Sequence, residues 1–246
     1  MVTFGESSVM LAAETVSTGC GPLDRLLPAG GVRRGGLLEW LCPEWQSNGG
    51  AFGGAASGAV SLAFAVARRL AGAEGASGRA VVVVDRGARF HPPAVMPWFD
   101  GAEGPQLIVA RPARDGDEIW AIDQALRCPG VAAVIAWPER VHPTAMRRWQ
   151  LAARGGGAVG LLVRPATARR EPSWAEARVA VSSRPSPGCA TRLLRLSLAG
   201  GPWAGEAMLS ERSVEVELDL VHGRMRSGKA GGLRSLRQEA PACRAS

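Results

Sequence analysis

Lysine is almost absent from this sequence. Lys229 is the only one, although the chain has 29 basic residues in 246. Lysine is the side chain that holds the β- and γ-phosphates in a phosphate loop ending in Gly-Lys-Ser/Thr. Because Lys229 lies near the C-terminus, far from the glycine-rich run at residues 46–58, the sequence excludes a phosphate loop of the usual kind.

Histidine and cysteine do not occur in metal-binding arrangements. The chain has three histidines and five cysteines, and no two cysteines form a C-x-x-C pair. Because zinc sites need several such ligands at short spacings, no metal site is expected. We expect the cysteines to be reduced thiols, mostly small buried groups. They are Cys20, Cys42, Cys128, Cys189 and Cys243.

Long apolar runs are missing as well. No apolar stretch reaches the roughly 20 residues that span a bilayer, and the N-terminus lacks a basic stretch followed by an apolar core. We therefore expect a cytoplasmic protein that does not contact a membrane. The length and the 46% hydrophobic content suit one α/β domain with tails. We expect a lead-in over residues 1–15, a core domain over 16–222 and a basic disordered tail over 223–246.

Acidic residues are outnumbered by basic ones. The net charge is +7 and the sequence pI is about 10.3. This balance favours contact with nucleic acid or with an acidic protein. The joint abundance of Ala, Gly, Pro and Arg is as typical of a GC-rich genome, so both interpretations stay open.

Strand and helix patterns alternate along the first two thirds of the chain. Short apolar runs typical of buried strands are followed by segments with apolar residues at helical spacing. This alternation predicts an α/β fold with a mostly parallel sheet and helices on both faces. The expected strands cover residues 37–41, 81–84, 106–110, 131–137 and 158–163, and the expected helices cover 57–70, 115–127 and 143–154.

The pattern changes after Arg164. Strand-like runs then follow one another without helices between them, at residues 178–182, 191–198 and 214–220. The last of these alternates strictly between apolar and acidic residues, which is typical of an antiparallel strand with one exposed face. We expect antiparallel strands at the C-terminal end of the sheet.

Two connecting regions carry further predictions. A short helix is expected over residues 23–27, with Ser17 or Thr18 as its N-cap. Residues 87–104, which are rich in proline and aromatic residues, are expected to form a loop.

A glycine-rich run connects the first long strand to the first long helix, which is the arrangement of a phosphate loop. After the last glycine, Gly58, the chain has Ala59 and Val60 in place of lysine and a hydroxyl residue. Such a loop retains only backbone N–H groups as anion ligands, so no nucleotide cofactor is expected. The degenerate loop includes Gly53, Ser57, Gly58, Ala59 and Val60.

One pattern near the N-terminus has the form S-T-G…L-D…G-G…G…E, and its last two members are Gly35 and Glu39. It resembles the segment that leads into the phosphate loop of the bacterial RecA recombinase. Residues 120–134 and 146–163 resemble later helix–strand pairs of RecA, in the same order. The resemblance covers about residues 4–181 and implies a RecA-like P-loop core.

The sequence departs from RecA at the catalytic positions. Asp85, at the end of a strand, is kept, but four other elements are lost together. Loss of a single charge-stabilising group costs about 10² or more in rate, so we expect no ATPase activity and no enzyme. The replacements are Ala59 and Val60 for the lysine and hydroxyl residue, Gly87 for the catalytic glutamate, Ala136 for the metal-binding aspartate, and Arg164-Pro165 for the polar sensing pair.

The segments that hold DNA in RecA are also reduced here. The second of them corresponds to residues 164–173, where Arg164, Arg169 and Arg170 are candidate contacts with DNA or a partner. A solvated basic loop is the alternative interpretation. Trp137 follows a strand where a catalytic acid is expected, and it is a candidate partner contact, with burial in the core as the alternative.

A RecA-like core without these groups resembles the ImuA family of SOS mutagenesis cassettes. The runs at residues 83–93, 120–129 and 164–174 fit the same family. Membership implies a non-catalytic accessory role in SOS-induced translesion synthesis and mutagenesis, exerted through protein–protein interaction. The implied partners are ImuB, a catalytically inactive relative of Y-family polymerases, and an error-prone replicative-type DNA polymerase. RecA itself is a further partner that the resemblance suggests.

Two other functions stay open at this point. One is an ATP-dependent recombinase with an unusual phosphate site. The other is a RecA-related regulator outside mutagenesis, such as a cell-division inhibitor of the SulA kind. A nucleotide-binding assay distinguishes a recombinase from a non-catalytic accessory protein. Binding to ImuB or to the division protein FtsZ distinguishes the accessory protein from a division inhibitor.

Overall fold

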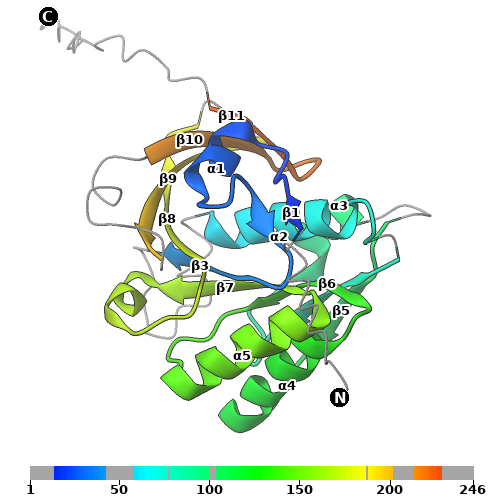
Figure 1. Ribbon diagram of the computed structural model, residues 1–246. Helices are drawn as coiled ribbons and strands as arrows, with labels where there is room; N and C mark the ends of the chain where they lie inside the picture. Colours follow the sequence, from blue (N-terminus) through cyan, green and yellow to red (C-terminus); the bar gives the residue numbers. More distant parts are fainter. Residues whose placement is uncertain are drawn as a thin grey trace, which may run out of the picture.

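The computed structural model describes residues 14–42, 58–76, 78–99, 104–186, 188–201 and 213–228. Within these ranges, nine strands form one sheet in the order β11-β10-β9-β8-β3-β7-β6-β4-β5, and β1 pairs with β2 separately (Figure 1). The strands are β1 (Thr15–Val16), β2 (Val32–Arg33), β3 (Leu37–Cys42), β4 (Ala80–Val84), β5 (Leu107–Ala110), β6 (Val131–Ala136), β7 (Val159–Pro165), β8 (Ala177–Arg184), β9 (Thr191–Gly200), β10 (Ser213–Asp219) and β11 (Arg224–Ser227). The α-helices are α1 (Gly21–Leu26), α2 (Ala59–Ala71), α3 (Met96–Phe99), α4 (Asp115–Arg127) and α5 (Pro143–Gly156), and the 3-10 helices are η1 (Pro92–Ala94) and η2 (Ala166–Arg170).

The large sheet has a parallel part and an antiparallel part. All neighbours in the series β8-β3-β7-β6-β4-β5 run parallel. Strands β9, β10 and β11 continue the sheet through antiparallel pairings. In the centre, Trp40 of β3 is paired with Val163 of β7 and Val179 of β8. The predicted α/β class, with a mostly parallel sheet and antiparallel strands at its C-terminal end, is therefore confirmed.

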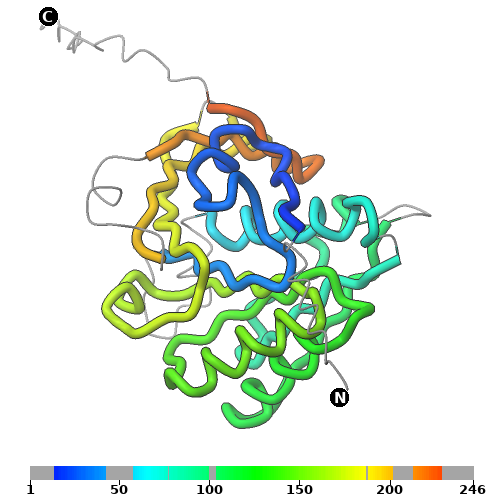
Figure 2. Tube along the Cα trace, viewed as in Figure 1, coloured from blue at the N-terminus to red at the C-terminus, as the bar shows by residue number. Residues whose placement is uncertain are grey.

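Helices cover both faces of the parallel strands. Figure 1 shows α4 and α5 side by side on one face and α2 on the other. Alternate residues of β3 serve the two cores: Leu38 and Trp40 pack in the cluster that contains α2, and Leu37 packs in the cluster that contains α4 and α5. The antiparallel strands bend around α1 and α2 (Figure 2). No helix in the described ranges is long and apolar enough to cross a bilayer.

Local sequence signals set the ends of the longer helices. α5 begins at Pro143, in the first turn, where the missing N–H of proline costs no hydrogen bond. The ring of His142, its N-cap residue, accepts a hydrogen bond from the Thr144 N–H. The C-cap residue after the helix, Gly157, has a φ of 77°, the left-handed conformation that terminates many helices. α4 has three acidic residues in its first turn, where their negative charges interact favourably with the positive end of the helix dipole.

The short helix α1 is present, but its predicted cap is wrong. The N-cap residue is Cys20, which makes no capping hydrogen bond through its side chain. Asp24, inside the helix, accepts hydrogen bonds from the backbone N–H (2.8 Å) and hydroxyl (2.7 Å) of Thr18. It also accepts one from the hydroxyl of Ser17 at 2.6 Å. Both predicted capping hydroxyls, of Ser17 and Thr18, therefore donate to the Asp24 carboxylate.

The expected loop over residues 87–104 contains two short helices, η1 and α3. They form because apolar side chains in this segment can be buried: Trp98 and Phe99 of α3 are only 4% and 6% exposed. The Trp98 indole N–H donates to the carbonyl oxygen of Leu220 at 3.0 Å. α3 is therefore held against the turn between β10 and β11, which the sequence pattern did not indicate.

The predicted start of the disordered tail, at residue 223, is also wrong. Residues 224–227 form β11, which pairs with Val216–Asp219 of β10. Gly223, with a φ of 62°, completes the turn, and Met225 is buried. The hairpin turn and this apolar residue attach the segment to the sheet. Residues 229–246 of the predicted tail and residues 1–13 of the predicted lead-in lie outside the described residues.

A buried carboxylate joins α4 to α5. The side chain of Asp123 is 1% exposed and accepts hydrogen bonds from Arg127 of its own helix and Arg148 of α5, at 2.9–3.3 Å. Burial alone would raise the pKa of Asp123. The hydrogen bonds and charges of the two arginines outweigh this effect, so the pKa lies below its ordinary value of 3.8.

Asp123→Asn is expected to lower the free energy of unfolding by about 1–3 kcal/mol at neutral pH, because two guanidinium groups lose their charged partner. The folded-state pKa is below the unfolded value, so the stabilisation is complete above about pH 4 and is lost as the pH falls further. Urea unfolding of both proteins, from neutral pH down to the acid range, measures this difference. Asp117→Asn, at an exposed position of α4, is the charge-matched control. If the difference in unfolding free energy between wild type and Asp123→Asn did not decrease at acid pH, the assigned role of the Asp123 carboxylate would be contradicted.

Candidate functional site at the ends of the parallel strands

The candidate site lies at the C-terminal edge of the parallel strands, where ligands bind in open α/β sheets. The ends of β4, β6 and β7 bring Asp85, Trp137 and Arg164 to this edge. α2 connects the parallel strands β3 and β4 and therefore starts at the same edge. The structure thus gathers the positions that the sequence singled out from distant parts of the chain.

The described residues at the start of α2, Gly58 to Val60, carry no charged side chain of their own, although the side chain of Arg192 lies beside Gly58. Its N-cap, Gly58, has a φ of 78°, and a Cβ there would lie 2.5 Å from the side chain of Leu194. Ala59 is fully buried, and Val60 is partly exposed. Neither supplies the cation or hydroxyl of a working phosphate loop. Of the predicted loop, Gly58, Ala59 and Val60 are described, whereas Gly53 and Ser57 lie outside the described residues.

The carboxylate of Asp85 holds the loop that follows β4. One oxygen accepts the backbone N–H of Arg89 at 2.9 Å, and the other accepts that of Phe90 at 3.0 Å. The side chain is 1% exposed, and the nearest guanidinium nitrogen of Arg111 is 3.9 Å away. Ala88, within this loop, has a φ of 50°. Asp85 therefore acts as a local anchor that keeps a tight turn in place.

Trp137 is buried in the hydrophobic core of the described residues. It is 8% exposed, and its ring stacks on Phe90 with the centroids 6.4 Å apart. Phe90 stacks in turn on Phe64 of α2 at 4.9 Å, and Phe99 meets Phe64 edge-on at 6.2 Å. This continuous aromatic stack confirms the core interpretation of Trp137. The alternative prediction, a partner or DNA contact at Trp137, is wrong.

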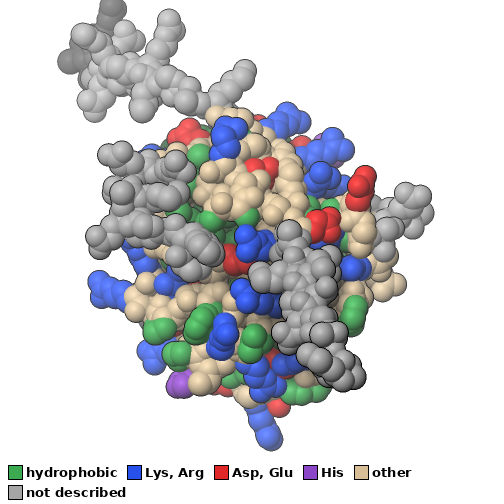
Figure 3. Space-filling model, viewed as in Figure 1, with side chains coloured by type: hydrophobic (Ala, Val, Ile, Leu, Met, Phe, Trp, Pro, Cys, Tyr) green, Lys and Arg blue, Asp and Glu red, His purple; other side chains and the backbone are tan. Residues whose placement is uncertain are grey.

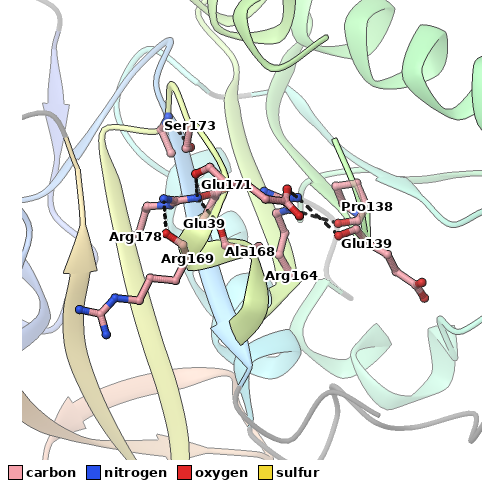
Figure 4. Close-up of polar contacts among 10 residues, drawn as sticks. Glu39, Pro138, Glu139, Arg164, Ala168, Arg169, Glu171, Ser173 and Arg178 are labelled. Atoms are coloured by element: carbon pink, nitrogen blue, oxygen red, sulfur yellow. Dashed lines mark hydrogen bonds and ion pairs between the residues drawn. The ribbon is translucent and has the colours of Figure 1, made fainter. Parts of the chain in front are cut away.

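Arg164 is also buried, with 1% of its side chain exposed. It donates to the carboxylates of Glu39 (2.7 Å) and Glu171 (2.6 Å), and to the carbonyl oxygens of Pro138 (3.2 Å) and Glu139 (3.4 Å) (Figure 4). Its guanidinium is directed into the protein at every one of these contacts. The prediction that Arg164 contacts DNA or a partner is therefore wrong.

Arg178 of β8 completes this buried network. Its guanidinium donates to the second carboxylate oxygen of Glu39 and to the carbonyl oxygens of Ala168 (2.7 Å), Arg169 (3.1 Å) and Glu171 (3.0 Å). Glu39 itself is 0% exposed. Two guanidinium groups thus face the two carboxylates of Glu39 and Glu171, so the charges balance. The carbonyl contacts fasten η2 and the chain after it to the sheet.

Arg169 and Arg170 remain candidates for contact with an anionic partner. Both lie on η2 and are exposed. Arg169 gives its carbonyl oxygen to Arg178, while its side chain extends away from the network (Figure 4). Arg178 fixes the η2 backbone through hydrogen bonds to two of its carbonyl oxygens. The side chains of Arg169 and Arg170 therefore extend from a rigid segment.

Sequence reasoning missed the members of the network as a unit. A signal was present, since Glu39 is the single charged residue in the apolar strand Leu37–Cys42. A charge in a strand that is buried on both faces requires a charged or strongly polar partner. The pattern could therefore have predicted a buried ion pair, although it could not have named Arg164 and Arg178 as the partners.

Within the described residues, no three His, Cys, Asp or Glu side chains are grouped so as to hold a metal ion. The chain matches no protein-family model, and no curated protein is significantly similar to it. The functional inference therefore depends on the geometry of this edge and on the residue patterns of the sequence.

Glu39→Gln is expected to lower the free energy of unfolding by about 3–5 kcal/mol, because two buried guanidinium groups would lose a charged acceptor. Urea unfolding followed by circular dichroism measures the loss. Arg170→Gln, at an exposed position on η2, should change stability by no more than about 0.5 kcal/mol. Equal and small effects for the two variants would contradict a structural role for Glu39.

Proposed function

We propose that this protein is a non-catalytic, RecA-like accessory protein of SOS-induced translesion synthesis, and that it acts through protein–protein contacts. The observation that carries the proposal is the state of the C-terminal edge of the strands. The positions at which a RecA-type ATPase holds nucleotide and metal carry buried methyl groups at Ala59 and Ala136, and a guanidinium with internal partners at Arg164.

Electrostatics supports the absence of catalysis. A triphosphate with its metal needs cations directed at the phosphates and carboxylates directed at the metal. Both carboxylate oxygens of Asp85 accept hydrogen bonds from backbone N–H groups, and Arg164 donates its hydrogen bonds to carboxylates and carbonyl oxygens within the protein. Each charge that is missing from such a site costs about 10² or more in rate. Loss of several together supports an adaptor rather than a motor.

Packing supports the same proposal. The stack of Trp137, Phe90 and Phe64 lies between α2 and the loop after β4, close to the end of β6. Aromatic side chains in a continuous core contribute stability without any ligand. A scaffold that is packed in this way does not depend on a bound nucleotide for its fold.

The cellular role comes from the resemblance to the ImuA family. On that basis the partners are an ImuB-type relative of Y-family polymerases and an error-prone replicative-type DNA polymerase, with RecA as a further candidate. The exposed arginines Arg169 and Arg170 make additional contact with DNA an accessory feature of the proposal, not its basis.

Isothermal titration of the purified protein with ATP and Mg²⁺ is expected to show no binding tighter than about 1 mM. The physical reason is that Ala59 and Val60 stand where a phosphate loop carries its lysine and hydroxyl residue. An active RecA recombinase, titrated in parallel, is the positive control. Micromolar binding that depends on Mg²⁺ would contradict the proposal and favour an ATP-dependent recombinase.

Co-expression with the ImuB-type polymerase relative from the same genome is expected to yield a complex that co-elutes in size-exclusion chromatography. An active Y-family polymerase from that genome serves as the matched control and should elute separately. Deletion of the gene should lower mutation frequency after DNA damage. Co-elution with FtsZ in place of the polymerase relative would overturn the proposal in favour of a division inhibitor.

A further inference from the structure

The outer surface of α4 and α5 carries large apolar side chains that the rest of the described structure does not cover. Among the described residues, six large apolar side chains are exposed, and three of them belong to this surface: Trp120 (60%), Leu151 (50%) and Trp174 (44%). The other three, Met96, Ile108 and Val221, are on different elements. We call this surface the α4–α5 face, formed by Trp120, Arg127, Arg147, Arg148, Leu151 and Trp174.

Contacts between the elements hold these side chains in one region. The guanidinium of Arg147 lies over the ring of Trp174, 4.3 Å from its centroid. Leu151 follows Arg147 by four residues and therefore lies one turn further along the same side of α5. Arg148, three residues before Leu151, pairs with Asp123, three residues after Trp120, and this pair attaches α5 to α4. Figure 3 shows hydrophobic and basic side chains interspersed over α5 and α4, in the lower part of the view.

The charge of the α4–α5 face is positive. Arg127 and Arg148 are each 51% exposed, whereas Asp123, which they share, is 1% exposed. The exposed acidic side chains of α4 lie in its first turn, where Asp117 is three residues before Trp120, and the arginines lie along the rest of the face. The surface that a partner meets therefore consists of arginines around apolar anchors, a combination that is enriched at the energetic centres of protein interfaces.

We infer that the α4–α5 face docks an acidic amphipathic helix of a partner protein. Leu151 and the edges of the two indoles would contact the apolar side of that helix. The arginines would bind its carboxylates, and Arg127, Arg147 and Arg148 are already held in place by Asp123 and Trp174. A helix with apolar side chains on one side and carboxylates beside them matches this distribution of apolar and basic side chains.

Single-stranded nucleic acid fits this surface less well. Bases stack on open aromatic faces, but one face of Trp174 is covered by Arg147. Leu151 provides no stacking surface. The inference rests on the proposed function only in that it specifies how a protein partner would be recognised.

The test uses a fluorescein-labelled peptide of about 20 residues, designed as a helix with leucines at i, i+3, i+4 and i+7 and glutamates beside them. Fluorescence anisotropy with the full chain should show saturable binding. Leu151→Glu and Trp120→Ala should each weaken it about tenfold or more, since both remove exposed anchors. A peptide with lysine in place of glutamate should not bind. Circular dichroism would verify that the variants remain folded.

Arg226→Gln is the control for net charge, because Arg226 is exposed on β11, away from α4 and α5. Its binding to the peptide should stay within about twofold of wild type. Equal weakening by Arg226→Gln and the two face variants would show non-specific attraction to a basic protein and would overturn the inference. So would binding of a 20-nucleotide thymidine oligomer that the face variants abolish while the peptide fails to bind.

The outcomes also separate this inference from the proposed function. If the peptide does not bind but the ImuB-type relative still co-elutes with wild-type protein and with Leu151→Glu, the docking inference fails alone. If the peptide binds with the expected dependence on Leu151 and no polymerase relative co-elutes, the proposed cellular role fails while the docking surface stands.

Discussion

The buried carboxylate of Glu39 is the interaction on which the centre of the sheet depends. It lies on β3 between Arg164 of β7 and Arg178 of β8, so one side chain links three neighbouring strands through charged hydrogen bonds. Removing such charges from water is costly, and only a nearly complete set of partners compensates for the cost. Both guanidinium groups supply that set by also binding backbone carbonyls in the segments that follow β6 and β7.

This network also determines the character of the edge at which a ligand would bind. A guanidinium that is committed to a balanced internal network is not available to neutralise a phosphate. The neighbouring positions are filled by apolar packing, with Trp137 stacked on Phe90 and Ala59 fully buried. Internal ion pairs and aromatic packing therefore fill these positions at the edge of the sheet, in agreement with the proposed non-catalytic role.

The repeating apolar patterns were sufficient to predict most of the sheet and the long helices. The valine run of β4 and the helical spacing in α2 and α5 are local signals, and the structure has elements there within one or two residues of the predicted bounds. The errors arose where long-range contacts decide. α3 forms because Trp98 finds Leu220, 122 residues away, and β11 forms because a glycine turn returns the chain to β10. No local pattern contains that information.

The candidate site shows the same limit. The absence of lysine and of a hydroxyl residue directly after Gly58 could be read from the sequence, because it concerns only which residue type occupies a position. The burial of Arg164 could not be predicted in this way, because a basic residue at the end of a strand is equally consistent with an exposed contact and with a buried ion pair. Only the pairing of β3 with β7 and β8 brings Glu39 to it. A charged residue within an otherwise apolar strand is the one local sign of such a partner.

Comparison of the two carboxylates that each hold two arginines explains why one cluster is structural and the other is available for binding. Around Glu39, both arginines are nearly inaccessible, at 1% and 9% side-chain exposure. Around Asp123, both are about half exposed, at 51%, although the carboxylate is equally buried. The second arrangement holds two guanidinium groups in place at the surface. It therefore lowers the entropic cost of ordering these side chains when a partner binds. Because exposed Trp120 and Leu151 lie on the same two helices, this face combines rigid charge with apolar contact area.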